Sequence, residues 1–181
     1  NMTTDSDLFR KGGNGWPLFQ GRTIHHYNAS FGPVERRVDP VEGEKRLARR
    51  RRSLPDELPD RNFRLAWRVI AQATDSRSLI GTVIPPRVFC GNALNATEII
   101  YKGRMVSDPE LLSGVNVILS SLCSDFYVRL RSARNVNAFI VRSIPVPRDI
   151  SAIRKLGRLA LPLYLGAAFA AFRGSVPEMP D

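Results

Sequence analysis

The chain has 181 residues, of which 43% are hydrophobic, enough for one ordinary domain or for one domain with a tail. Its formal charge of +10 indicates a polyanionic partner. Nucleic acid is the first expectation for this partner, and an anionic membrane is the second. Two cysteines without a CxxC pattern argue against a disulfide framework, so a reducing cytoplasm is the expected location.

The N-terminal third combines a polar start with a strongly basic segment. Residues 1–15 hold little apolar material and end in a glycine-rich run, which predicts a flexible lead. The segment Glu42–Arg52 favours a basic helix that ends before Pro55. Its consecutive arginines form either a solvated surface run or a phosphate clamp whose affinity falls with salt. We favour the clamp, formed by Arg49, Arg50, Arg51 and Arg52.

Two adjacent histidines, His25 and His26, are the only histidines in the chain. On a strand they would point to opposite faces, and no other ligand-type residue falls at a suitable spacing, so no metal site is expected. A packed or hydrogen-bonded pair is the preferred interpretation.

The central segment alternates between apolar and polar residues. Phe63, Leu65, Trp67 and Val69 share one face of a predicted half-buried strand. The alternative is a helix over 63–73, because Phe63, Trp67 and Ile70 also match a helical stripe. Leu79–Ile84 is a second apolar segment that Pro85 ends, and small polar residues at 74–78 allow a turn between the two. We expect this strand pair to seed a mixed sheet.

Helices are predicted to cover that sheet, which gives an α+β fold. Asp108 and Pro109 are typical of a helix start, and the helix is expected to run to about Leu130. Its buried face would hold Leu111, Val115, Ile118, Leu122 and Phe126. Residues 136–144 are expected to form a buried strand, and a last helix begins at Asp149 or Ser151. The apolar stretch 159–172 is too short to span a membrane, so it is a core helix or a docking surface.

Several of these segments, in this order and spacing, resemble the C-terminal target-recognition domain of large adenine-specific DNA methyltransferases. That family includes type IIG restriction–modification enzymes and related phage-defence methylases. The resembling segments are Pro17–Tyr27, Phe63–Arg68, Leu79–Pro86, Leu111–Tyr127 and Asn137–Pro147. The resemblance implies a DNA target-recognition domain over residues 16–148, followed by a C-terminal apolar helix and tail over 149–181. It also implies double-stranded DNA and a methyltransferase domain or subunit as partners; the apolar tail adds a possible homo-oligomer.

Candidate DNA contacts follow from residue type. Arginines suit phosphates, and asparagine pairs with adenine through two hydrogen bonds. The arginines at the end of the long predicted helix have a second interpretation, in which they satisfy the last helix carbonyls. Beyond the clamp, the phosphate candidates are Arg64, Arg68, Arg129, Arg131 and Arg134, and the base-reading candidates are Asn92, Asn95 and Asn137.

The chemistry of methyl transfer is missing from the chain. An adenine methyltransferase needs Asn/Asp-Pro-Pro-Tyr/Phe, whereas the Pro85-Pro86 pair here follows Ile84 and precedes Arg87. A glycine-rich methyl-donor loop and a complete metal-dependent nuclease motif are also lacking. We therefore expect no catalysis by this chain alone and no cofactor in it, with S-adenosylmethionine bound by a separate methyltransferase domain. The alternative function is a non-catalytic interaction or scaffold domain that assembles through its apolar C-terminal helix.

Overall fold

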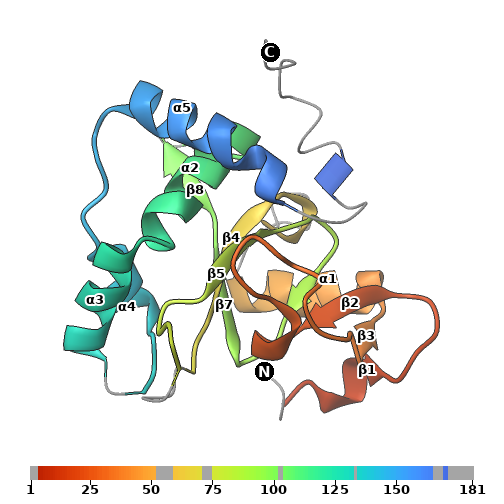
Figure 1. Cartoon of the computed structure of the whole chain (residues 1–181). Helices are drawn as coiled ribbons and strands as arrows, with labels where there is room; N and C mark the ends of the chain where they lie inside the picture. Colours follow the sequence, from red (N-terminus) through yellow and green to blue (C-terminus); the bar gives the residue numbers. More distant parts are fainter. Residues whose placement is uncertain are drawn as a thin grey trace.

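The computed structural model describes residues 4–51, 59–70, 75–101, 104–132, 134–164 and 169–170, which form an α+β fold (Figure 1). At its centre, β4 (Arg64–Arg68) lies between β5 (Gly81–Ile84) and β7 (Leu94–Thr97), and both pairings are antiparallel. The predicted strand pair is therefore confirmed, with Leu65 opposite Val83 and Trp67 opposite Gly81. The rival helix over 63–73 is wrong for residues 64–68.

The central sheet is buried more completely than the alternation predicts. Leu65 and Trp67 lie in the core as expected, but Arg64 and Ala66 on the opposite face are buried as well. The third strand, β7, was not predicted, because its sequence has no clear period. Of the polar turn predicted over 74–78, residue 74 lies outside the described residues.

A second sheet packs beside the first and has the order β1-β3-β2-β6. Its strands are β1 (Phe9–Arg10), β2 (Trp16–Phe19), β3 (Arg37–Val38) and β6 (Phe89–Cys90). Because β2 runs parallel to β6 while its other pairings are antiparallel, this sheet is the mixed one. The fold thus contains the expected mixed sheet, while the β4–β5 pair lies in the antiparallel sheet beside it. A separate hairpin consists of β8 (Ile99–Tyr101) and β9 (Arg104–Val106).

The predicted flexible lead is part of the fold from residue 4 onward. The 3-10 turn η1 (Ser6–Leu8) leads into β1, which pairs with β3. Further on are the 3-10 turns η2 (Gly21–Thr23) and η4 (Pro59–Arg61). The basic helix α1 (Pro40–Arg51) is confirmed, and it packs closely on β6. A Cβ atom at Gly43 would lie 2.5 Å from the Phe89 ring, so only glycine permits this approach.

The long helix predicted from Pro109 is two helices, α2 (Pro109–Leu119) and α3 (Leu122–Arg131), which meet at a bend of 59°. Its start is confirmed, because the Asp108 carboxylate accepts the Glu110 N–H at 3.0 Å. Ser121 then caps α3 by accepting the Ser124 N–H, and this new start turns the helix. Leu122 and Phe126 therefore leave the buried face and are 73% and 64% exposed, which corrects their predicted place in the core.

The buried strand predicted over 136–144 is also wrong, because α4 (Ala138–Arg142) occupies most of this range. Ile140 and Val141 are buried, whereas Phe139 is 71% exposed. A short apolar run of this kind fits a buried strand and a buried helix equally well, so periodicity alone did not decide between them.

The last helix, α5 (Ile150–Ala160), lies across α2 (Figure 1). Asp149 caps it by accepting the Ala152 N–H, as predicted. The two helices touch at their backbones, since a Cβ atom at Gly157 would lie 1.7 Å from the Glu110 carbonyl oxygen. α2 in turn contacts β5 and β4, so helices cover the central sheet as expected.

The described part of the C-terminal tail belongs to the main core. After the 3-10 turn η5 (Leu161–Leu163), the side chains of Leu161, Tyr164 and Phe169 are buried in the same cluster as Trp67. The boundary proposed at residue 149 therefore does not separate two cores. In the described part of the chain, no single helix has the length and hydropathy to cross a membrane, and only the bent pair α2 and α3 has them jointly.

Candidate nucleic-acid interface

Many acidic side chains in the described part of the chain have a basic partner within the fold. Seven of them form ion pairs with arginines: Asp5, Asp7, Glu35, Glu44, Asp108, Glu110 and Asp125. In contrast, several exposed cations have no acidic partner among the described residues: Lys11, Lys45, Arg49, Arg87, Arg134, Arg142, Arg148 and Lys155. The positive surplus of the sequence is therefore displayed at the surface.

The structure divides the predicted arginine clamp at the end of α1. Arg49 is exposed, and Lys45 precedes it by one helical turn on the same side of α1. Arg50 instead donates to the Asp5 carboxylate at 2.8 Å. Arg51 is the last residue of α1 and its side chain is not described, and Arg52 lies outside the described residues. Of the predicted clamp, Arg49 alone is described as exposed and unpaired.

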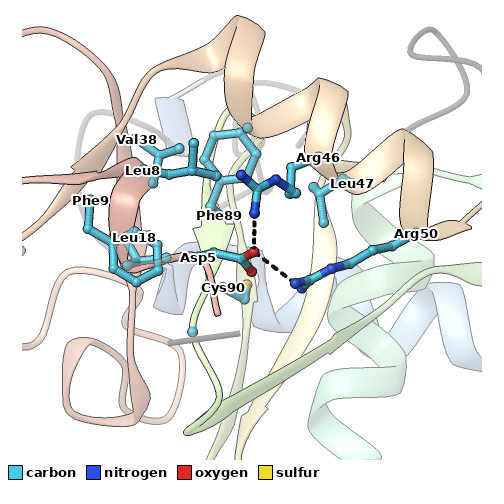
Figure 2. A pocket seen from close by; sticks show the side chains of 12 residues that line it. Asp5, Leu8, Phe9, Leu18, Val38, Arg46, Leu47, Arg50, Phe89 and Cys90 are labelled. Atoms are coloured by element: carbon cyan, nitrogen blue, oxygen red, sulfur yellow. Dashed lines mark hydrogen bonds and ion pairs between the residues drawn. The ribbon is translucent and has the colours of Figure 1, made fainter. Parts of the chain in front are cut away.

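Residues of the N-terminal lead neutralise two arginines of α1 (Figure 2). The Asp5 carboxylate, whose side chain is 7% exposed, accepts from both Arg46 and Arg50. Arg46 also pairs with Asp7 at 3.0 Å. Asp5, Arg46 and Arg50 border a small apolar hollow of about 60 Å³ that Leu18 and Phe89 also line. The lead thus removes part of the positive charge that α1 would otherwise present.

The two arginines of β4 are bound inside the protein. Arg64 is 6% exposed and donates to the Val88 carbonyl oxygen. Arg68 donates to the Ile24 carbonyl oxygen through Nε and through a terminal nitrogen, at 3.1 and 2.6 Å. Burial lowers the pKa of Arg68. Arg64, predicted to bind a phosphate, is therefore a buried structural residue. Arg68, a second phosphate candidate, donates hydrogen bonds to the backbone.

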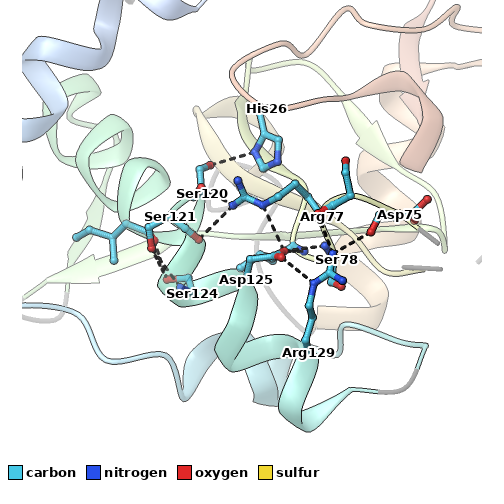
Figure 3. A network of polar contacts seen from close by, with 12 residues as sticks. His26, Asp75, Arg77, Ser78, Ser120, Ser121, Ser124, Asp125 and Arg129 are labelled. Carbon is cyan, nitrogen blue, oxygen red and sulfur yellow. Dashed lines mark hydrogen bonds and ion pairs between the residues drawn. The ribbon is translucent and has the colours of Figure 1, made fainter. Parts of the chain in front are cut away.

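Arg129, near the end of α3, ties that helix to the loop before β5 (Figure 3). Its Nε donates to Asp125 at 2.9 Å, and a terminal nitrogen donates to the Asp75 and Ser76 carbonyls, each at 2.8 Å. Arg131 lies over the Tyr127 ring, 3.7 Å from its centroid. Arg129 therefore joins α3 to this loop, and the carbonyl groups that it binds are not those of its own helix end. Its phosphate contact stays a prediction. Arg134 is exposed.

Asp125 is the centre of this network. One carboxylate oxygen accepts the backbone N–H groups of Ser78 and Leu79 at 2.7 and 2.8 Å, and the other accepts from Arg129. Burial alone would raise the pKa of Asp125, but these hydrogen bonds and the nearby Arg77 cation outweigh it, so the pKa lies below its ordinary value. The carboxylate fixes the loop to α3.

The histidine pair is packed and hydrogen-bonded, as expected. The rings of His25 and His26 meet edge to face at 5.4 Å, and His26 Nδ1 lies 3.3 Å from the Ser120 hydroxyl (Figure 3). Burial, together with the Arg77 cation, lowers the pKa of His26 to about 4. His26 is therefore neutral near pH 7.

The three asparagines proposed to read bases lie on different elements. Asn92 is exposed in the loop between β6 and β7. Asn95 is half-buried in β7, opposite Trp67. Asn137 is exposed immediately before α4, and its side chain makes no capping hydrogen bond. Asn92 and Asn137 thus retain the exposure that base reading requires.

Sequence reasoning missed a hollow of about 370 Å³ lined by Trp16, Arg61 and Arg87. These residues come from β2, η4 and the turn after β5, so no local motif connects them. The one local signal was the Pro85-Pro86 pair before Arg87, which was interpreted as the end of a strand and as an incomplete catalytic motif. The hollow combines an aromatic ring with two guanidinium groups.

Among the described residues, no group of three or more His, Cys, Asp or Glu side chains is placed to hold a metal ion. Comparison of the chain with protein-family models, curated proteins and solved structures finds no match. A function is therefore inferred from the geometry above and from the resemblance of the sequence segments.

Proposed function

We propose that this chain binds double-stranded DNA as the target-recognition part of an adenine-specific DNA methyltransferase of the restriction–modification type. The observation that supports DNA binding is the set of exposed cations that have no acidic partner in the described part of the chain, Lys45, Arg49 and Arg87 among them. The order and spacing of the resembling segments support the methyltransferase family.

In this proposal, the basic side chains position the duplex and the exposed asparagines read it. Contacts from Lys45 and Arg49 to phosphates would fix the register without reading sequence. Asn92 and Asn137 are the candidates for pairing with adenine edges. The catalytic step would take place in a separate methyltransferase domain or subunit that binds S-adenosylmethionine, and the complex would work in the cytoplasm.

A protein partner is supported by exposed apolar side chains on α3 and α4. Leu122, Phe126 and Leu130 repeat every four residues along α3 and are 73%, 64% and 67% exposed, and Phe139 of α4 is 71% exposed. Large apolar side chains grouped on one helix face are characteristic of contact surfaces. The proposed methyltransferase partner would cover this face. The same observation favours the second candidate function, a non-catalytic interaction domain.

A paired substitution experiment tests the DNA proposal. The test variant is Lys45→Ala with Arg49→Ala, which removes two unpaired surface cations. Its control is Arg22→Ala with Arg154→Ala, which removes two exposed cations that are paired with Glu35 and Asp108. Both variants change the net charge equally. Fluorescence anisotropy with a labelled duplex should show a larger loss of affinity for the test variant, similar for all duplex sequences. A parent protein that binds no duplex at about 50 mM salt would contradict the proposal.

A further inference from the structure

The hollow lined by Trp16, Arg61 and Arg87 has the composition of a nucleotide-binding surface. It measures about 370 Å³, within the usual range for small ligand sites. Guanidinium groups bind phosphate oxygens through directed N–H donors, and an indole offers a flat apolar surface. The hollow therefore suits a ligand with an anionic part next to an apolar part.

Two of the three lining side chains are held in place by neighbouring residues. The Trp16 ring is stacked on the Phe89 ring, with centroids 5.4 Å apart, and Phe89 is itself buried. Arg61 donates to both carboxylate oxygens of Glu44, at 2.8 and 3.0 Å, which fixes the plane of its guanidinium. This arrangement limits the rotamer freedom that binding would otherwise have to remove.

Arg87 has an unusual backbone conformation, with φ at +62°. An L-residue without a short polar side chain rarely adopts this left-handed region, and it persists only where the surroundings impose it. Here two prolines precede Arg87, and its N–H donates to the Asp60 carbonyl oxygen at 2.6 Å. The exposed guanidinium is carried by a turn that a glycine or asparagine would form more easily.

We propose that this hollow binds one sugar–phosphate unit of the DNA backbone. The phosphate oxygens accept hydrogen bonds from Arg87, with Arg61 beside it, while the deoxyribose packs on the indole of Trp16. This inference rests on the proposed function, because it assumes that DNA is the ligand of the chain. It adds a defined contact point that the predicted arginine clamp did not include.

The backbone conformation of Arg87 provides a sharp test. Arg87→Asn and Arg87→Gly both suit a positive φ, so each variant should melt at or above the temperature of the parent. Each should nevertheless bind a labelled duplex about five- to tenfold more weakly, as expected for one lost charged contact. Trp16→Leu should weaken binding by a similar factor. The matched control is Arg22→Asn, which removes one exposed cation that is paired with Glu35.

The outcomes separate the two proposals. If the parent binds no duplex, the proposed function fails. If the parent binds, but the Arg87 and Trp16 variants bind as tightly as it does, the proposed function stands and the backbone site is overturned. An equal loss in the Arg22→Asn control also overturns the site, since only total charge would then matter. A poly-glutamate peptide that competes as well as unlabelled duplex would overturn it in favour of an acidic protein ligand.

Discussion

The strand β4 and the helix α1 are both rich in arginine, but they use it in opposite ways. In β4, Arg64 and Arg68 donate to backbone carbonyl oxygens within the protein. In α1, Arg49 extends from the surface with no acidic partner among the described residues, and Arg50 is held by Asp5. The number of arginines in the sequence therefore overstates the number of cations left unpaired at the surface.

The difference follows from where each element lies. β4 is the middle strand of its sheet and is covered on both faces, so its guanidinium groups must find acceptors inside. α1 packs against the second sheet through Gly43, and its other sides face water or the acidic lead. Central position makes an arginine structural, and an outer helix face leaves it available.

The largest expected effect concerns the apolar neighbour of the β4 arginines. Trp67 is 2% exposed, and its indole N–H donates to the Val136 carbonyl oxygen at 3.0 Å. Trp67→Ala should lower the free energy of unfolding by roughly 3–5 kcal/mol, because it leaves a large cavity. Chemical denaturation of the parent and the variant measures this difference in the free energy of unfolding. Trp67→Phe should cost less, and an alanine variant as stable as the parent would show that β4 is not the centre of the core.

The next prediction compares the two regions directly. Arg68→Ala should destabilise the fold by about 1.5–3 kcal/mol, because it removes charge-assisted bonds to the Ile24 carbonyl oxygen. Arg49→Ala should change stability by no more than about 0.5 kcal/mol, as expected for an exposed residue without partners. Equilibrium unfolding in urea gives both values. Equal effects at the two positions would remove the distinction between structural and surface arginines.

A further expected effect is a pH dependence from His26. Its folded-state pKa of about 4 lies below the ordinary value of 6.5, so the unfolded chain binds a proton more readily. The contribution of neutral His26 to the free energy of unfolding is therefore fully present above pH 6.5. It is lost as the pH falls from 6.5 towards 4. Thermal melts across this range should show the loss, and His26→Gln should reduce it. A pH dependence identical in His26→Gln would assign the effect to other groups.

Local sequence signals account for the elements that form from neighbouring residues. Alternation located β4, and the acids Asp108 and Asp149 marked two helix starts. The break between α2 and α3 was missed because the apolar spacing continues across it, while the decisive cap is the single hydroxyl of Ser121. The pairing of β2 with β6 joins residues about seventy positions apart, which no local pattern encodes.

The candidate site was less predictable than the fold, because exposure depends on tertiary structure. Nothing in the sequence separates Arg64, which reaches the Val88 carbonyl, from Arg49, which reaches water. The hollow lined by Trp16, Arg61 and Arg87 likewise forms only because the tertiary fold brings three distant segments together. The overall positive charge could be read directly from the sequence, and the polyanionic partner inferred from it stays a prediction.

The central claim is that unpaired surface cations, and not the total arginine content, bind DNA. The most direct test is the salt dependence of duplex affinity, measured between about 50 and 200 mM salt, for the parent and for Lys45→Ala with Arg49→Ala. The plot of log affinity against log salt should become less steep by about 1.8 when two phosphate contacts are lost. The claim would be contradicted if Lys45→Ala with Arg49→Ala kept the slope of the parent. Arg22→Ala with Arg154→Ala is the paired-cation control.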